Sequence, residues 1–187
     1  MRIAALAALA LPILLALPAT AQRVADQNAA RGQLFGDRTV VSIQRHGFLT
    51  QGDIATLQAM PRVADLKYYG AMAAAPGAGL QAETTTGAFN YHSPARARAA
   101  ALQGCEAKRR GGAACVIVAD VLPRGFRPGQ ALTLNQDASR AVNGRALRRN
   151  GGVLAASAST GAWALGPDAA TARANCGQGD CQVVVAP

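Results

Sequence analysis

Two stretches of the chain repeat the same order of residue types around a pair of cysteines, and this repeat constrains the fold more than any other feature. In each copy a Ser/Thr-Thr-Gly-Ala-aromatic segment leads through an alanine-rich stretch to one cysteine, and a second cysteine then opens an apolar run. The matching segments are Thr85–Phe89, Cys105 and Cys115–Asp120 in the first copy, and Ser159–Trp163, Cys176 and Cys181–Ala186 in the second. Internal similarity of this kind predicts that one supersecondary unit is built twice.

The residues of each copy predict two strands, a helix and a third strand. Compact apolar runs at 69–74 and 152–157 contain small residues that suit strands approached closely by other backbone. Gly87 and Gly161 mark turns next to them. Both helices are predicted to deliver a cysteine to their last turn, and both β-branched runs after the second cysteine are predicted to be buried strands.

Helix starts are marked in both copies. Ser93 followed by Pro94 combines an N-cap residue with proline at the first helical position. Ala97, Ala101 and Cys105 then recur every four residues on one face. In the second copy Pro167-Asp168 precedes Ala169, Ala172 and Cys176, which share one face in the same way.

A weaker match extends the repeat upstream. Residues 39–43 before 52–57 resemble residues 131–134 before 136–142. If this match holds, each unit has the order βαββαβ. We therefore predict the α+β class, with two similar small subdomains, each an antiparallel sheet with a helix, clamped by a disulfide.

The ends and breaks of the sequence predict the domain organisation. Residues 1–21 resemble a secretory signal peptide, with a charge at Arg2, an apolar stretch and a small-residue cleavage site before Gln22. The apolar stretch is too short for a membrane span and is broken by Pro12. The predicted parts are a signal peptide at 1–21, a flexible segment at 22–36, a first unit at 37–123, a linker at 124–130 and a second unit at 131–187. We expect export to the periplasm or the medium.

Four cysteines in an exported chain indicate two disulfides. Because each copy must close by itself, we expect Cys105 to pair with Cys115 and Cys176 with Cys181. The alternative of a four-cysteine zinc site has the wrong spacings, which are ten and five residues. A redox-active pair lacks the Cys-x-x-Cys motif.

The charge of the chain predicts anionic partners. The formal net charge is +9 and 17 of the 19 basic residues are arginines, a bias that also reflects the composition of a GC-rich genome. Basic residues gather at Lys108-Arg109-Arg110 and at Arg145 with Arg148-Arg149. They form either a face that docks anions or solvated loops and helix ends. We expect anionic envelope components or an exported protein as partner, and not nucleic acid, because aromatics do not interleave with the arginines.

The equivalent aromatics Phe89 and Trp163 are interpreted first as core anchors of small sheets. Exposed, they would instead form a platform for a carbohydrate or peptide.

No segment of the sequence predicts a catalytic centre, a metal site or a cofactor. His46 and His92 are the two histidines, and no motif frames either of them. No nucleophile elbow, zinc-protease motif or phosphate-binding loop occurs. We therefore expect a protein that is not an enzyme and that has no cofactor.

The pattern of residues 68–120 and 151–186 resembles an exported bacterial domain-of-unknown-function family with tandem, Gly/Ala-rich, two-cysteine repeats. The resemblance implies no catalytic residues. Similar short chains are sometimes labelled 5-aminolevulinic acid synthase. A pyridoxal-phosphate enzyme needs a Schiff-base lysine on a large scaffold, whereas this chain offers Lys67 and Lys108 in a short mature protein.

Three functional hypotheses follow. The leading one is an exported, non-enzymatic binding or structural protein of the bacterial envelope. The second is a proteinaceous inhibitor of an exported cell-wall hydrolase. The third is an unrecognised enzyme, which would need a pocket that encloses His92 or His46 together with a carboxylate.

Overall fold

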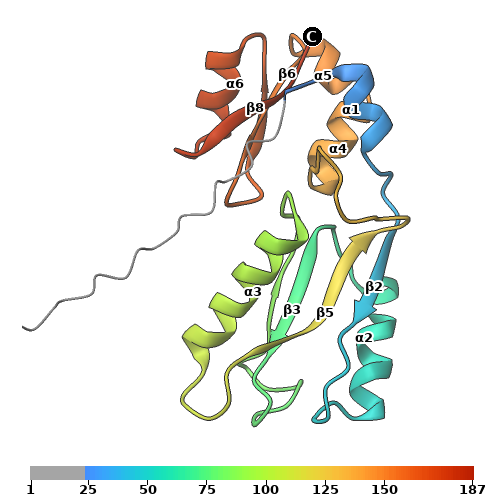
Figure 1. The fold of residues 1–187 in the computed structure, drawn as a ribbon, viewed down its shortest axis with the longest axis vertical. Coiled ribbons are helices and arrows are strands. Elements are labelled where there is room, and N and C mark those ends of the chain that lie inside the picture. Colours follow the sequence, from blue (N-terminus) through green and yellow to red (C-terminus); the bar gives the residue numbers. More distant parts are fainter. Residues whose placement is uncertain (1–23) are drawn as a thin grey trace, which may run out of the picture.

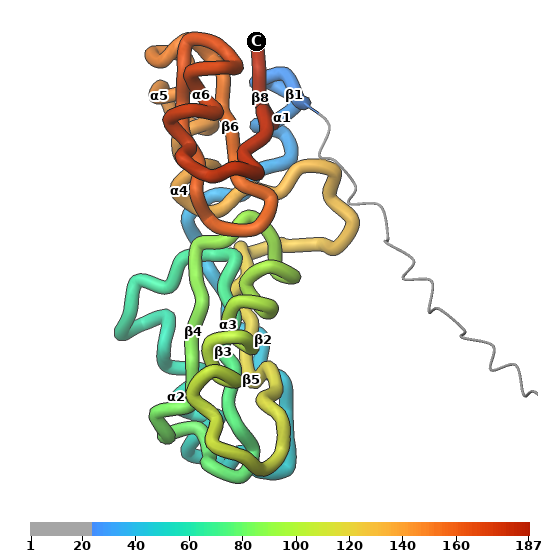
Figure 2. The backbone as a smooth tube through the Cα atoms, turned by 90° about the vertical axis from the view of Figure 1, so that its left-hand side faces the viewer, coloured from blue at the N-terminus to red at the C-terminus, as the bar shows by residue number. Residues whose placement is uncertain are grey.

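The computed structural model describes residues 24–187, so the predicted signal peptide lies outside the described residues. Two units lie end to end along the long axis of the molecule (Figures 1 and 2). Each unit contains one four-stranded sheet, and the class is α+β as predicted. None of the helices within residues 24–187 has the length and apolar character that a membrane span requires.

The first unit has the order βαββαβ. Its elements are β2 (Thr39–Ile43), α2 (Gln51–Val63), β3 (Gly70–Ala74), β4 (Thr86–Ala88), α3 (Pro94–Lys108) and β5 (Val116–Pro123). The sheet order is β2-β5-β3-β4, with every neighbouring pair antiparallel. Helix α3 begins as predicted, because the Ser93 hydroxyl caps the Arg96 N–H and Pro94 follows at the first helical position.

The second unit has a sheet of corresponding order, β1-β8-β6-β7. Its elements are β1 (Ala25–Asp26), α1 (Gln27–Gln33), α4 (Gln136–Asn143), α5 (Ala146–Arg149), β6 (Val153–Ser157), β7 (Trp163–Gly166), α6 (Ala169–Cys176) and β8 (Cys181–Ala186). Asp168 caps α6 through the Thr171 N–H, which agrees with the predicted helix start.

Two expectations from the sequence differ from the structure. Residues 131–134 form no strand, although Leu132 and Leu134 are buried in the core of the second unit. The edge position of the sheet is taken by β1, which pairs in parallel with β8 through Ala25 and Val185. The segment predicted to be flexible therefore contributes a strand and helix α1, because Ala30 of α1 enters the same core.

Both sheets are covered on two faces, and alanine makes the close packing possible. In the first unit α3 sets Ala97 and Ala101 against Ala71 and Ala73 of β3, and all four side chains are fully buried. On the other face α2 packs Leu57 into a separate cluster. Small side chains let a helix approach a sheet without voids, which keeps the interior at crystal-like density.

The two disulfides are confirmed, with Cys105 bonded to Cys115 and Cys176 bonded to Cys181. Each bond joins the last turn of a helix to the start of the next strand, at the residue before β5 in the first unit and at the first residue of β8 in the second. The zinc alternative is wrong, because all four sulfur atoms are used in these bonds. In the chain-entropy model, loops of this size contribute about 2 to 3 kcal/mol each.

An ion pair between the buried Asp120 and Arg98, whose side chain is 46% exposed, fastens α3 to β5. Both carboxylate oxygens of Asp120, which is 1% exposed, accept hydrogen bonds of 2.6 Å from Arg98, and Gln44 donates a third at 3.0 Å. The planar guanidinium therefore compensates a charge that would be costly to bury alone.

The units meet through aromatic packing and a polar seam, which we define as Asn90, His92, Asn135, Asp137 and Gly161. Phe35, Tyr68, Tyr69 and Phe126 form three edge-on ring contacts and one tilted contact, with centroids 5.5 to 6.4 Å apart. Phe126 belongs to the predicted linker, so that segment packs into the junction.

Asn135 is the centre of the polar seam and is fully buried. Its side-chain amide donates to the carbonyl oxygens of Asn90 and Gly161 at 2.9 Å, and its carbonyl caps α4 at the Ala138 N–H. A Cβ atom at Gly161 would lie 2.2 Å from the Asn90 oxygen, so glycine is required where the units touch.

The buried ring of His92 is held in one neutral tautomer by the seam. Its Nδ1 accepts the Asn135 N–H at 3.1 Å, so Nε2 carries the proton and donates to the Ala162 carbonyl at 3.0 Å. Burial lowers the pKa of His92 below its ordinary value, although the Ala162 hydrogen bond opposes this shift.

Protonation of His92 is therefore expected to destabilise the protein at mildly acidic pH. Because the unfolded chain binds this proton more readily, the stability from the neutral ring is full above pH about 6.5 and declines below it. The free energy of unfolding should fall by up to about 1.4 kcal/mol per pH unit as pH drops towards the lowered pKa. Urea unfolding of the protein and of His92→Asn between pH about 7 and 5 measures this slope. Equal slopes in the two proteins would contradict the assignment.

Candidate functional site

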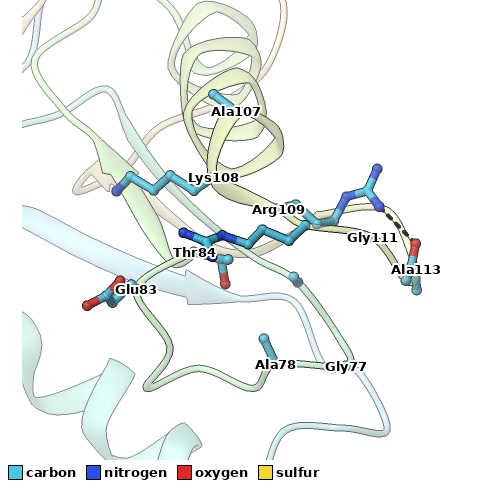
Figure 3. Close-up of a pocket in the computed structure, with 12 residues that line it drawn as sticks. Gly77, Ala78, Glu83, Thr84, Ala107, Lys108, Arg109, Gly111 and Ala113 are labelled. Carbon is cyan, nitrogen blue, oxygen red and sulfur yellow. Dashed lines mark hydrogen bonds between the residues drawn. The ribbon is translucent and has the colours of Figure 1, made fainter.

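A cleft of about 850 Å³ opens at the far end of the first unit, between the loop after β3 and the loop after α3 (Figure 3). We call it the basic cleft. One wall is formed by residues 107–113 and the other by residues 75–84. Its volume is in the range of pockets that hold small-molecule ligands.

The wall formed by residues 107–113 carries three cations in succession, Lys108, Arg109 and Arg110. Lys108 and Arg110 are exposed and form no ion pair with any residue of the described range 24–187. Figure 3 shows the Lys108 side chain extending away from the end of α3. Unpaired cations at one wall make the cleft electrostatically attractive to anions.

Arg109 is held in place by its neighbours. Its Nε donates to Glu106 at 2.6 Å and its Nη1 donates to the Gly112 carbonyl at 2.8 Å. Glu106 also accepts the Cys115 N–H at 2.6 Å. The Cys115 N–H and then Arg109 lower the pKa of the Glu106 carboxyl, so this carboxylate stays charged and ties Arg109 to the disulfide loop.

The backbone of the same wall adds uncommitted donors. Gly111 and Gly112 have positive φ angles of 120° and 77°, which turn the chain sharply. Within the described residues, the N–H groups of residues 111–113 donate no hydrogen bond to another protein group. Successive free N–H groups beside cations form an anion-binding concavity.

The opposite wall contributes one carboxylate and small residues. Glu83 is exposed and forms no ion pair with a residue of the described part of the chain. Gly77 and Ala78 leave the cleft wide on this side (Figure 3). The Thr84 hydroxyl is buried and has no hydrogen-bond partner in the structure.

The structure separates the two basic groups that the sequence suggested. Arg148 and Arg149 are exposed on α5, at the end of the molecule opposite the loop after α3 (Figure 1). The two groups therefore cannot form one face, and only Lys108, Arg109 and Arg110 line the cleft.

Phe89 and Trp163 are half-buried and lie outside the basic cleft. The ring of Phe89 lies over Gly70 and Gly87, where an added Cβ would come within 2.5 Å of ring atoms. Trp163 packs against the core cluster of the second unit. Trp163 therefore fits the core-anchor interpretation, whereas Phe89 packs over the glycine backbone of β3 and β4 and belongs to none of the core clusters.

The histidines lie away from the cleft. His92 uses both ring nitrogens in the seam. His46 contacts the Ile117 carbonyl through Nε2 at 2.8 Å and stacks on Phe48. In residues 24–187, no three His, Cys, Asp or Glu side chains are grouped so that they could hold a metal ion.

The sequence held one signal for the cleft, which is a difference in length between the two copies. The connection between β3 and β4 runs from 75 to 85, whereas that between β6 and β7 runs from 158 to 162. The connection from α3 to β5 is likewise longer than that from α6 to β8. Both insertions lie in the first unit, and together they make the two walls.

Comparisons with protein-family models, with curated proteins and with solved structures gave no match to this chain.

Proposed function

We propose that this protein is an exported binding protein of the bacterial envelope, and that it binds an anionic ligand in the basic cleft. The observation that carries the proposal is the cleft itself, in which three cations face one carboxylate across a volume of about 850 Å³. Two of the cations are unpaired, so a ligand anion need not displace an internal partner. The two disulfides support export, because such bonds persist in oxidising compartments.

The arrangement of the wall supports binding of a ligand more than general adhesion of a charged surface. Arg109 is fixed by two hydrogen bonds, and the loop that carries it is closed by the Cys105–Cys115 bond. Fixed donors lose less conformational entropy on binding than free side chains do.

The double substitution Lys108→Ala/Arg110→Ala is expected to weaken binding of an anion at least about tenfold, because each lost charged hydrogen bond contributes about 1.5 kcal/mol or more. Titration of the oxidised protein with glucose 6-phosphate and with glucuronate, followed by amide NMR signals, measures the effect. Signals of residues 108–113 should move with the ligand.

The matched control is Arg148→Ala/Arg149→Ala, which removes the same number of charges from exposed positions on α5. This variant should bind as the unchanged protein does. An equal loss in both variants would show that net charge and not the cleft attracts the anion, and binding of neither anion would contradict the proposal.

A further inference from the structure

We propose that the ligand of the basic cleft carries a phosphate monoester on a hydroxylated skeleton, as a sugar phosphate does; this inference rests on the proposed function above. The first argument is the number of donors. The cleft wall offers Lys108, Arg110 and the free N–H groups of residues 111–113. A phosphate monoester presents three strong acceptor oxygens, whereas a carboxylate presents two.

The second argument is charge. Arg109 is already paired with Glu106, so Lys108 and Arg110 are the two cations of the lining that have no ion-pair partner among the described residues. A phosphate monoester carries about −1.5 to −2 at neutral pH and can pair with both of these cations, whereas a carboxylate carries one charge. The same wall carries both the cations and the free backbone N–H groups, and this combination suits a tetrahedral anion, which accepts hydrogen bonds from several directions.

The third argument concerns the rest of the ligand. A cleft of about 850 Å³ is far larger than a phosphate group needs, so the phosphate would occupy one wall and leave the other side for the skeleton. Glu83 lies on that side and has no ion-pair partner among the described residues, so it can accept hydrogen bonds from ligand hydroxyls. The other lining residues there are small and leave room for a compact polar skeleton.

The test compares four probes on the oxidised protein by titration calorimetry: glucose 6-phosphate, glucose 6-sulfate, glucuronate and inorganic phosphate. Because the second ionisation of a phosphate monoester lies near pH 6, the dianion fraction falls about tenfold from pH 7 to pH 5, so the apparent affinity for glucose 6-phosphate should be about tenfold higher at pH 7. The sulfate ester has the same shape and keeps one charge, so its affinity should not follow this change. It also reports any effect of pH on the charged groups of the cleft, which are Glu83, Glu106 and the three cations.

Glu83→Gln removes the carboxylate on the skeleton side and keeps its size. Because Glu83 is proposed to accept hydrogen bonds from ligand hydroxyls, this variant should lower the affinity for glucose 6-phosphate more than the affinity for inorganic phosphate. Equal binding of glucuronate and glucose 6-phosphate, or a sulfate ester that binds as tightly at pH 7, would overturn the phosphate assignment and leave the proposed function intact. Binding of anionic phosphatidylglycerol vesicles without binding of any soluble probe would overturn it in favour of a membrane surface. An absence of any binding that depends on Lys108 and Arg110 would remove the proposed function as well.

Discussion

Arg98→Leu is expected to lower the free energy of unfolding by about 3 to 5 kcal/mol, because it leaves the Asp120 carboxylate buried without its cation. Asp120 is 1% exposed in β5 and receives two of its three hydrogen bonds from Arg98. Small domains have about 5 to 15 kcal/mol of stability in total, so this single change should approach the limit for folding. Urea unfolding at neutral pH measures the loss.

Arg96→Leu is the matched control, since Arg96 is exposed two residues earlier on the same helix and forms no ion pair with a residue in the described range. It should change stability by less than about 0.5 kcal/mol. The double variant Arg98→Leu/Asp120→Asn should recover much of the loss, because the uncompensated charge is gone. A loss in Arg98→Leu no larger than that in the control would show that Asp120 finds other compensation.

Cys105→Ser/Cys115→Ser is expected to lower both the stability of the protein and its affinity for the ligand, and the two effects can be measured independently. Stability should fall by about 3 kcal/mol, because the closed loop no longer restricts the unfolded chain. Binding of glucose 6-phosphate should also weaken, because the same loop carries Arg109 and the free N–H groups of the cleft wall. Thermal unfolding and the NMR titration described above measure the two effects.

Cys176→Ser/Cys181→Ser provides the comparison within the same molecule. It opens the corresponding loop of the second unit, which does not line the cleft. It should cost about 2 kcal/mol of stability and leave the affinity unchanged. If both pairs lowered the affinity alike, the binding defect would reflect general loss of structure, and the Cys105–Cys115 loop would have no special part in the cleft.

Sequence reasoning identified the elements whose signals are local. The helix caps at Ser93 and Asp168 can be recognised from the residues next to them. The helical spacing of Ala97, Ala101 and Cys105 likewise predicts the buried face of α3. The disulfide pairing followed from the repeat in the same way, because each pair is close in sequence. Such features depend on short stretches of chain and little else.

Local sequence signals do not predict which strand forms the edge of the second sheet. Leu132 and Leu134 alternate as strand residues do, and both are buried, yet no strand pairs with them. The place is taken by β1, whose partner in β8 lies at the other end of the sequence. Pairing across such a separation is decided by the packing of α1 and by Ala30 in the core, and neither leaves a local pattern.

The cleft was only partly visible in the sequence. Charge marks Lys108, Arg109 and Arg110 in the sequence, but it marks Arg148 and Arg149 equally. What distinguishes the first group is the loop after β3, which closes the space opposite it. Nothing in the sequence marks Glu83 and Thr84, because carboxylates and hydroxyls are common in loops. Only their position opposite the wall of cations distinguishes them.

The position of β1 and α1 in the second unit has a consequence for the order of events in folding. The first unit is complete once Pro123 has emerged, because all its strands and helices lie between Thr39 and that residue. The second unit needs Ala25 beside Val185, so its edge strand must wait until the last strand has been made. We therefore expect the first unit to fold early and to hold its flanking segments near each other. The entropic cost of bringing β1 and β8 together is then lower, because the folded first unit already shortens the effective loop between them.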